Sequence, residues 1–337
     1  MNTFKIKTIL VIVSLLIFDG LFAQNTLSRI SVNENQFVNQ NGDIMVFRGL
    51  NTSDPDKLET QGHWNKSYFE EIKKWGANLV RFPVHPPAWQ KRGKENYLAL
   101  LDDGIKWATE LGLYVIIDWH SIGNLRTEMY QADIYDTTKK QTFGFWRTIG
   151  KKYGTNTTVA FYELFNEPTT FNKELGTITW EQWKALNEEM IGIIRANGGK
   201  GIPLVAGFNW AYDLTPVKNN PLEVEGIAYV SHPYPQKREK PWEEKWTKDW
   251  GFVKEKYPII LTELGFCGPD DVGAHIPVIS DESYGDAITN YCDSNQISYV
   301  VWVFDAEWAP RLFNDWTNYT PSRHGKYFKD KLQSYKD

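Results

Sequence analysis

The sequence predicts a single (β/α)8 barrel with its functional site at the carboxyl ends of the strands. Eight short apolar runs alternate with amphipathic runs of helical periodicity, and such alternation implies parallel pairing. The chain has 337 residues, enough for one barrel of this kind, which typically takes about 250. Polar side chains also close most of the apolar runs, and parallel barrels carry their chemistry at strand ends.

The eight apolar runs are interpreted as strands buried on both faces. In chain order they are Met45–Leu50, Asn78–Val84, Leu113–His120, Val159–Asn166, Ile202–Phe208, Gly226–Pro233, Ile259–Glu263 and Ile297–Val303. The alternative fold is a doubly wound open sheet, which would be expected to carry a glycine-rich phosphate-binding loop after its first strand. Here the first strand ends Arg48-Gly49-Leu50-Asn51, which lacks that motif and favours the barrel.

The segments between the strands repeat apolar residues every three or four positions, the spacing of an amphipathic helix. One such stripe is Leu98, Leu101, Ile105 and Ala108, and another is Trp183, Leu186, Met190 and Ile194. A helix after each strand is what a parallel barrel needs in order to cover its outer surface.

Residues 1–23 are predicted to be a secretory signal peptide, and residues 24–337 the barrel domain. Lys5 and Lys7 precede the apolar stretch Ile9–Phe18, which is too short for a bilayer span of roughly 20 residues. An uncleaved anchor is the alternative. The interpretation implies a secreted protein, extracellular or periplasmic, that is free of the membrane after cleavage.

Composition narrows the class of partner. The formal net charge of −5 argues against a nucleic-acid partner, which would want a basic face. Aromatic residues make up 15% of the chain, and flat apolar faces suit the C–H faces of sugars. Cys267 and Cys292 are expected at opposite ends of a strand–helix unit, too far apart for a disulfide. No Cys/His spacing suggests a metal site.

The predicted strands end in polar and titratable groups that packing does not explain. The motifs are Arg81-Phe82-Pro83, Asp118-Trp119-His120, Asn166-Glu167-Pro168, His232-Pro233-Tyr234, Thr262-Glu263-Leu264-Gly265 and, at the eighth strand, Trp302. Glu167 and Glu263 each close a strand of their own. Since parallel strands end on one face, the two carboxylates are expected to converge, and a carboxylate pair is the minimum machinery for cleaving a glycosidic bond.

This ordered set resembles glycoside hydrolase family 5, the cellulase and mannanase family of clan A, over nearly all of residues 24–337. The resemblance implies a retaining mechanism with Glu167 as general acid/base and Glu263 as nucleophile. It also implies supporting roles. Arg81 and Tyr234 would hydrogen-bond the nucleophile, Asn166 would bind the sugar 2-hydroxyl, and His120 and His232 would position the reacting sugar and the acid/base.

The resemblance extends to the substrate groove. Trp302 matches the platform beneath the reacting sugar, and Trp210 a position that lines an outer subsite. Trp64, His85 and Trp308 are further candidates for substrate contacts. Three long loops follow or begin at strand ends and are expected to shape the groove: Thr52–Asn65, Pro233–Trp242 and Cys267–Asp281.

For Glu167 to act as acid and Glu263 as nucleophile, the first carboxyl group must be protonated while the second is ionised. Donation by Arg81 and Tyr234 is expected to hold the pKa of Glu263 down. Glu167 is expected to lack a cationic neighbour and to be raised in pKa by repulsion from Glu263.

The function predicted is a secreted, retaining endo-β-1,4-glucanase that is monomeric and needs no cofactor. Its partner would be a β-glucan. Within the family, a β-mannanase, a xyloglucanase and a mixed-linkage glucanase are the alternatives, because a few hydrogen bonds in outer subsites distinguish these substrates. Outside catalysis, a non-catalytic carbohydrate-binding barrel is the alternative, although both glutamates are present. A metal-dependent hydrolase is disfavoured because the 6 histidines are scattered.

Overall fold

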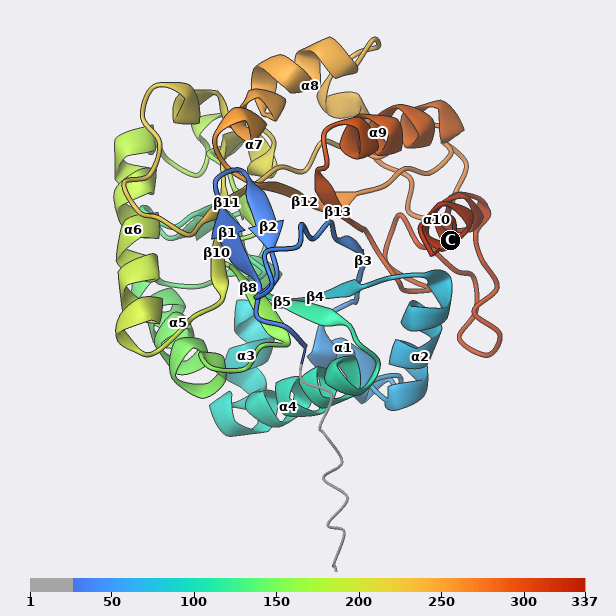
Figure 1. Cartoon of the computed structure of the whole chain (residues 1–337), viewed down its shortest axis with the longest axis horizontal. Helices are drawn as coiled ribbons and strands as arrows, with labels where there is room; N and C mark the ends of the chain where they lie inside the picture. The colour runs from blue at the N-terminus through green and yellow to red at the C-terminus, as the bar shows by residue number, and fades with distance from the viewer. Residues whose placement is uncertain (1–26, 337) are drawn as a thin grey trace, which may run out of the picture.

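Eight parallel strands close into a barrel, as predicted (Figure 1). This computed structural model describes residues 27–336, so the predicted signal peptide lies outside the described residues. In spatial order the strands are β3 (Arg48–Asn51), β4 (Leu79–Val84), β5 (Tyr114–Trp119), β8 (Val159–Glu163), β10 (Ile202–Ala206), β11 (Ala228–Val230), β12 (Ile259–Leu264) and β13 (Ser298–Val301). β13 pairs back onto β3, so the alternative of an open, doubly wound sheet is wrong.

Helices surround the barrel and cover its outer face (Figure 1). They are α1 (Pro55–Thr60), α2 (Lys66–Trp75), α3 (Pro86–Arg92), α4 (Lys94–Glu110), α5 (Lys139–Tyr153), α6 (Trp180–Ala196), α7 (Phe208–Ala211), α8 (Glu243–Asp249), α9 (Glu282–Ser294) and α10 (Arg323–Gln333). Short 3-10 turns complete the connections: η1 (Asp133–Tyr135), η2 (Phe171–Lys173), η3 (Thr215–Lys218), η4 (Pro235–Lys237) and η5 (Gly251–Glu255).

Local sequence sets the helix ends. Asn65 accepts a hydrogen bond from the backbone of Tyr68 at the start of α2, and Thr179 forms a capping box with Gln182 at the start of α6. Such caps satisfy backbone N–H groups that lack a partner in the first turn. Gly76 ends α2 with φ of 108°, and a Cβ there would lie 2.5 Å from the carbonyl oxygen of Leu332, so only glycine fits.

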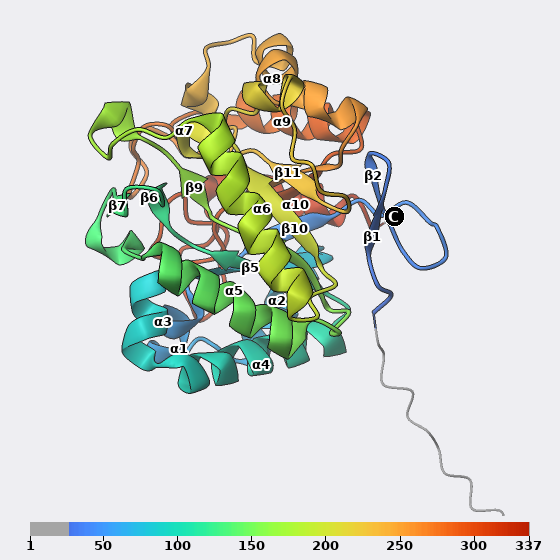
Figure 2. The ribbon, with the colours of Figure 1, turned by 90° about the vertical axis from the view of Figure 1, so that its left-hand side faces the viewer.

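An N-terminal hairpin closes the end of the barrel opposite the carboxyl ends of the strands. It consists of β1 (Ser31–Asn33) and β2 (Gln36–Val38), which lie at the right in Figure 2. Phe37 from β2 packs edge-to-face on Phe47 and Phe161, with ring centroids 5.9 and 5.1 Å apart. These rings belong to the apolar cluster that fills the barrel interior, so the interior is sealed from this end.

A small three-stranded sheet marks the other end of the barrel. β6 (Ile122–Asn124) pairs antiparallel with β7 (Met129–Tyr130) and parallel with β9 (Glu167–Pro168); it lies on the far side from the hairpin in Figure 2. The predicted strand Val159–Asn166 is therefore shorter than expected. β8 ends at Glu163, and the chain then leaves the barrel to pair with the extension of β5.

The larger apolar cluster lies between the strands and the surrounding helices. Both cysteines are free and buried, as predicted. None of the helices within residues 27–336 is long and apolar enough to cross a membrane.

Candidate active site

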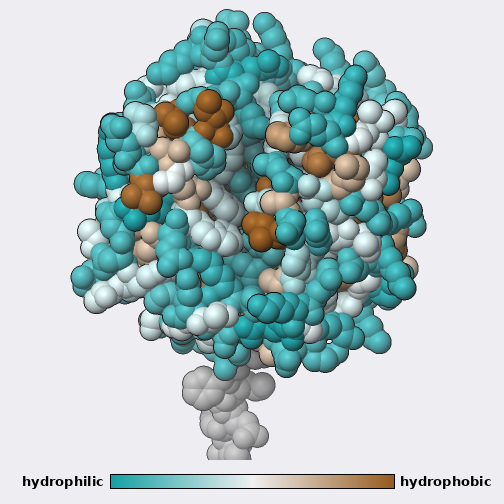
Figure 3. Space-filling model, turned by 180° about the vertical axis from the view of Figure 1, so that it is seen from behind, coloured by the Kyte–Doolittle hydropathy of each residue, from teal (hydrophilic) through white to brown (hydrophobic). Residues whose placement is uncertain are grey.

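The carboxyl ends of the strands open into a cleft of about 930 Å³ that contains both predicted catalytic glutamates. Figure 3 views the molecule from behind Figure 1 and shows a hollow at the centre of that face. One oxygen each of Glu167 and Glu263 and one nitrogen of His232 all lie within 4.8 Å of one another. Glu167 is 8% exposed and Glu263 5%, so both carboxylates reach the cleft while largely shielded from bulk water.

The backbone fixes the direction of Glu167. Its N–H donates to the carbonyl of Ser121 at 3.1 Å, and the N–H of Asn166 donates to the carbonyl of Trp119 at 3.1 Å. These bonds tie the segment after β8 to the end of β5. The side chain of Glu167 therefore projects over the mouth of the barrel and not into its wall.

Arg81 holds Glu263 in place. Its Nη1 donates to Glu263 at 3.0 Å and the Tyr234 hydroxyl donates to the other oxygen at 2.9 Å. The guanidinium is itself gripped by Glu163, with Nε–Oε2 at 2.6 Å and Nη2–Oε1 at 3.1 Å. Nη2 also donates to Asn166 at 2.7 Å. A buried bidentate arginine–carboxylate pair is geometrically rigid, so one cation orients both Glu263 and Asn166.

The expected pKa of Glu263 was wrong in direction. Burial raises it above the ordinary value, and the neighbouring charge of Glu167 adds to this, although His232, Arg81 and Tyr234 all lower it. Removing a carboxylate from water opposes its ionisation. The charged form of Glu263 therefore depends on its donors more strongly than a solvated carboxylate would.

Glu167 has a cationic neighbour that was not expected. His232 Nδ1 lies 2.9 Å from a Glu167 oxygen and its Nε2 lies 2.9 Å from the Thr262 hydroxyl. Burial opposes charge on His232, but Glu263, Glu163 and Glu167 raise its pKa to about 9.

A hydrogen-bond chain fixes which His232 nitrogen shares a proton with Glu167. The Thr262 hydroxyl donates to Glu163 at 2.8 Å. Against burial, Arg81 and His232 hold the pKa of Glu163 below its ordinary value, so Glu163 is ionised and accepts. The Thr262 oxygen must then accept from Nε2–H of His232. Nδ1 is left to share its proton with Glu167, so a proton is available beside this carboxylate.

A titration of stability tests the charge on His232. The folded protein keeps this proton up to about pH 9, whereas the ordinary pKa is 6.5. The free energy of unfolding is therefore expected to fall by about 3 kcal/mol as the pH rises through this window, because the unfolded chain has already lost the proton. Chemical denaturation at several pH values measures the slope. The His232→Asn variant should flatten it, and equal slopes would assign the titration to other groups.

The predicted platform is an aromatic stack along the cleft. Trp302 lies parallel to His120 with centroids 5.4 Å apart, and Trp308 follows at 6.0 Å. His120 Nδ1 lies 2.6 Å from Asp118. Burial, together with His85 and Arg81, lowers the pKa of His120 well below its ordinary value, so it is a neutral hydrogen-bonding group. His85 also lines the cleft, as expected.

Trp210 belongs to a strained aromatic corner. Asn209, Trp210 and Ala211 all have left-handed φ angles, as do Phe171, Asn172 and Lys173. Such backbone is unfavourable for residues with side chains, and it clusters at functional sites. Trp210 meets Phe171 edge-to-face at 5.8 Å, and Lys237 Nζ lies 4.7 Å from the centre of the Trp210 ring. All three of these side chains line the cleft.

Trp64 does not contribute to the cleft, so its assignment to the substrate groove was wrong. It is buried in the layer between β4 and α4, where its ring packs edge-to-face on Phe69 and Phe82. Its Nε1 donates to the carbonyl of Leu100 at 3.0 Å. Gly104 makes room for it, since a Cβ there would lie 2.4 Å from the indole.

Several residues that line or support the cleft were not predicted: Glu163, Thr262, Phe171, Tyr135 and Lys237. Glu163 carried a signal, because a carboxylate inside an apolar strand needs a buried partner. Tyr135 carried no signal, and Lys237 only that of its loop, Pro233–Trp242, because the direction of each side chain depends on tertiary packing. The loops Pro233–Trp242 and Cys267–Asp281 do supply cleft residues, as expected, among them Gln236, His275 and Ile276.

Glu167, His232 and Glu263 have the residue types of a metal site, but their environment does not suit a cation. His232 has its pKa raised to about 9, and metal ligation requires a neutral imidazole. Both of its nitrogens already have partners. Arg81 lies 3.0 Å from Glu263 and would repel an ion. The three side chains are therefore arranged to share a proton between His232 and Glu167 and not to hold a metal ion.

The chain matches the family model for cellulase, glycosyl hydrolase family 5, over residues 38–307. An endoglucanase A of Butyrivibrio fibrisolvens is 27% identical over 257 residues, covering 73% of this chain but 54% of that protein. The chain thus spans about half the length of that relative. An endoglucanase of Paenibacillus polymyxa is 21% identical over 85% of this chain and 82% of its own.

Solved structures show the same architecture. A β-glucanase of Saccharophagus degradans, crystallised with cellotetraose, is 49% identical and superposes with a TM-score of 0.91 over 93% of this chain and 95% of that one. The catalytic domain of a Thermobifida fusca endoglucanase shares the fold at 20% identity, with a TM-score of 0.73 over 90% and 97% of the two chains. The family model spans most of the barrel and agrees with the resemblance carried by the strand-end motifs. The chain therefore belongs to the cellulase family, glycosyl hydrolase family 5.

Proposed function

We propose that this chain is a secreted, retaining endo-β-1,4-glucanase. The observation that carries the proposal is the approach of Glu167 and Glu263, with one oxygen of each within 4.8 Å in an open cleft. Retaining glycosidases hold their two carboxyl groups about 5–5.5 Å apart, whereas inverting enzymes need about 6.5–9.5 Å to admit a water. The spacing therefore favours double displacement.

The site provides a role for each group in both steps. In the first step an ionised Glu263 oxygen attacks the anomeric carbon, and Glu167 passes a proton to the departing sugar oxygen. Bonding to the sugar removes the charge of Glu263, which eases ionisation of Glu167. Glu167 then takes a proton from water, and that water displaces Glu263 from the sugar. Asn166, oriented by Arg81, is placed to bind the 2-hydroxyl group.

The substrate proposed is a β-1,4-linked glucan, and the similarity to a β-glucanase crystallised with cellotetraose supports it. Mannan, xyloglucan and mixed-linkage glucan are the competing substrates. Reducing-sugar release from carboxymethyl cellulose, barley β-glucan, xyloglucan and mannan tests the choice, and exclusive action on mannan would overturn it. A product profile on cellohexaose tests endo-action, because an endo-acting enzyme cuts internal bonds from the first turnover.

Truncation of the platform is expected to weaken both binding and turnover. Trp302→Ala should lower kcat/KM on cellohexaose roughly 10- to 100-fold, because the ring positions the reacting sugar between the two carboxylates. Steady-state kinetics measure this. Trp64→Phe is the matched control, since Trp64 is buried in the core; it should lower the melting temperature without changing KM. Unchanged kinetics for Trp302→Ala would assign that residue to packing alone.

Secretion, a monomeric state and independence from metal complete the proposal. The N-terminal sequence of the mature protein tests cleavage after residue 23, and sedimentation tests the oligomeric state. Activity that survives a chelator is expected, because the pair of carboxylates needs no ion for acid/base chemistry. Binding of oligosaccharide without cleavage would favour the non-catalytic alternative.

A further inference from the structure

A second pocket lies beside the catalytic cleft, on the other side of one chain segment. Residues 128–138 form this segment, here called the strap. Three strap residues line the catalytic cleft, namely Gln131, Ile134 and Tyr135. Others face the opposite way and line a separate pocket of about 480 Å³, namely Glu128, Tyr130, Asp133, Asp136, Thr137 and Thr138. That volume is within the range of about 300–1,000 Å³ usual for small-ligand sites.

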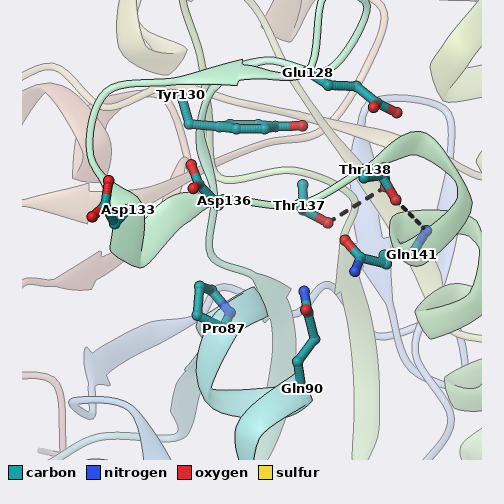
Figure 4. A pocket seen from close by; sticks show the side chains of 9 residues that line it. All are labelled: Pro87, Gln90, Glu128, Tyr130, Asp133, Asp136, Thr137, Thr138 and Gln141. Carbon is teal, nitrogen blue, oxygen red and sulfur yellow. Dashed lines mark hydrogen bonds between the residues drawn. The ribbon is translucent and has the colours of Figure 1, made fainter.

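A rigid aromatic ring covers one side of this pocket. Figure 4 shows the Tyr130 ring edge-on above the hollow, with Pro87 and Gln90 of α3 on the opposite side. Tyr130 pairs with Gly123 across the β6–β7 ladder. A Cβ at Gly123 would lie 2.7 Å from Tyr130 Cδ1, so the glycine lets the ring lie flat on β6. The other face of the ring is left to the pocket.

Four polar side chains of the remaining lining have no partner in the part of the chain that the structure describes, whereas Glu128, Thr137 and Thr138 are engaged in hydrogen bonds. Figure 4 shows the amides of Gln90 and Gln141 directed toward the hollow from α3 and α5. No hydrogen bond or ion pair within residues 27–336 engages these two amides or the carboxylates of Asp133 and Asp136. Amides and carboxylates at the edge of an aromatic face are the groups that recognise sugar hydroxyls while the ring contacts the apolar C–H face.

Charge narrows the ligand further. Among the residues that the structure describes, the lining holds three acidic residues, Glu128, Asp133 and Asp136, and neither lysine nor arginine. Phosphorylated ligands and acidic polysaccharides would be repelled at this site. A neutral hexose fits all of these groups, because its C–H face can pack on the Tyr130 ring while its hydroxyl groups hydrogen-bond the amides and carboxylates.

We propose that this pocket binds a glucose unit of a β-glucan chain outside the catalytic cleft. The inference rests on the proposed function for its choice of polymer. A unit held against Tyr130 lies across the strap from Tyr135, which lines the catalytic cleft, so the pocket would keep a long chain close to the cleft between cleavages. Short substrates would gain nothing from it.

Kinetics on long and short substrates test this. Tyr130→Ala should raise KM for barley β-glucan about 3- to 10-fold, the range expected for one lost aromatic contact. It should leave kcat on that polymer and kcat/KM on an aryl cellobioside unchanged. Tyr130→Phe is the matched control, because it keeps the ring, and the hydroxyl it removes has no hydrogen-bond partner among residues 27–336. It should behave as the wild type does.

A second variant guards against a folding defect in Tyr130→Ala. The double change Gln90→Ala and Gln141→Ala removes only the uncommitted amides, and it should also raise KM on the polymer and weaken retardation in native gels containing barley β-glucan. Unchanged KM on the polymer in both variants would overturn the proposal, as would equal losses on the polymer and the aryl cellobioside. Saturable binding of calcium that Asp136→Asn abolishes would instead assign the pocket to a cation. If the wild type cleaves no glucan at all, the proposed function fails, and this outcome is distinct from all the others.

Discussion

Replacing Glu263 by alanine is expected to lower hydrolysis of β-glucan on the order of 10⁴-fold or more, the scale seen when a covalent nucleophile is removed. Glu263 lies at the end of β12, where Arg81 and Tyr234 donate to its two oxygens. The two nearby glutamates within residues 27–336 are engaged elsewhere. Glu163 is committed to Arg81, and Glu167 is bonded to His232.

Rescue of the Glu263→Ala variant by azide tests whether the loss of activity comes from removal of the nucleophile. In the proposed mechanism the cavity left by Glu263→Ala would face the anomeric carbon, and a small anion there would attack an activated aryl cellobioside. The expected product is an α-glycosyl azide with inverted configuration, identified by NMR, because only one displacement has occurred. Rescue also shows that the variant is folded. A rescued product with retained configuration would contradict the assignment of Glu263 as nucleophile.

Replacing Glu167 by glutamine is expected to divide substrates by leaving group. Loss of a general acid typically costs about 10²- to 10⁴-fold, so hydrolysis of β-glucan, whose leaving group is an alcohol, should fall by that amount. Formation of the glycosyl-enzyme from a dinitrophenyl cellobioside needs no proton and should be almost unaffected. The measurement is kcat/KM on both substrates, with pre-steady-state release of the phenol.

The activated substrate is the internal control for Glu167→Gln, because fast phenol release requires an intact nucleophile and a folded cleft. Water attack in the second step lacks its base, so the glycosyl-enzyme should accumulate and be detectable by mass spectrometry. Equal losses on the two substrates would contradict the acid role of Glu167. The amide can still accept a hydrogen bond from His232, so the local structure should hold.

The barrel could be predicted because parallel strands are buried on both faces and therefore appear in the sequence as runs of apolar residues. Runs such as Ile259–Leu261 are apolar throughout, and this pattern can be seen in the sequence alone. The strand-end motifs were readable for the same reason, since all parallel strands of a barrel end on one face. Glu167 was predicted at a strand end, whereas it occupies a separate strand, β9, paired with β6. β6 and β9 are more than forty residues apart in the chain, and pairing between such distant, short segments leaves no periodic pattern in the sequence.

The errors have one physical cause. Trp64 was assigned to the groove because a tryptophan in a loop near a strand end can point either way, and only packing against Phe69 and Phe82 decides which. The pKa of Glu263 was misjudged because its donors were visible in the motifs but its burial was not. His232 was expected near Glu167, but its charge was missed because the raised pKa depends on the carboxylates of Glu263 and Glu163 around it as well as on Glu167.

The amino-acid sequence by itself determined the eight strands, the shared face of their polar ends and the meeting of Glu167 and Glu263 at that face. These follow from local burial patterns and from the rule that parallel strands end together. The tertiary structure alone decided the charge on His232, the strained Phe171–Trp210 corner and the two-sided strap. Each of those depends on distances between residues far apart in the chain, and electrostatic and packing energies vary with distance in space and not with separation in sequence.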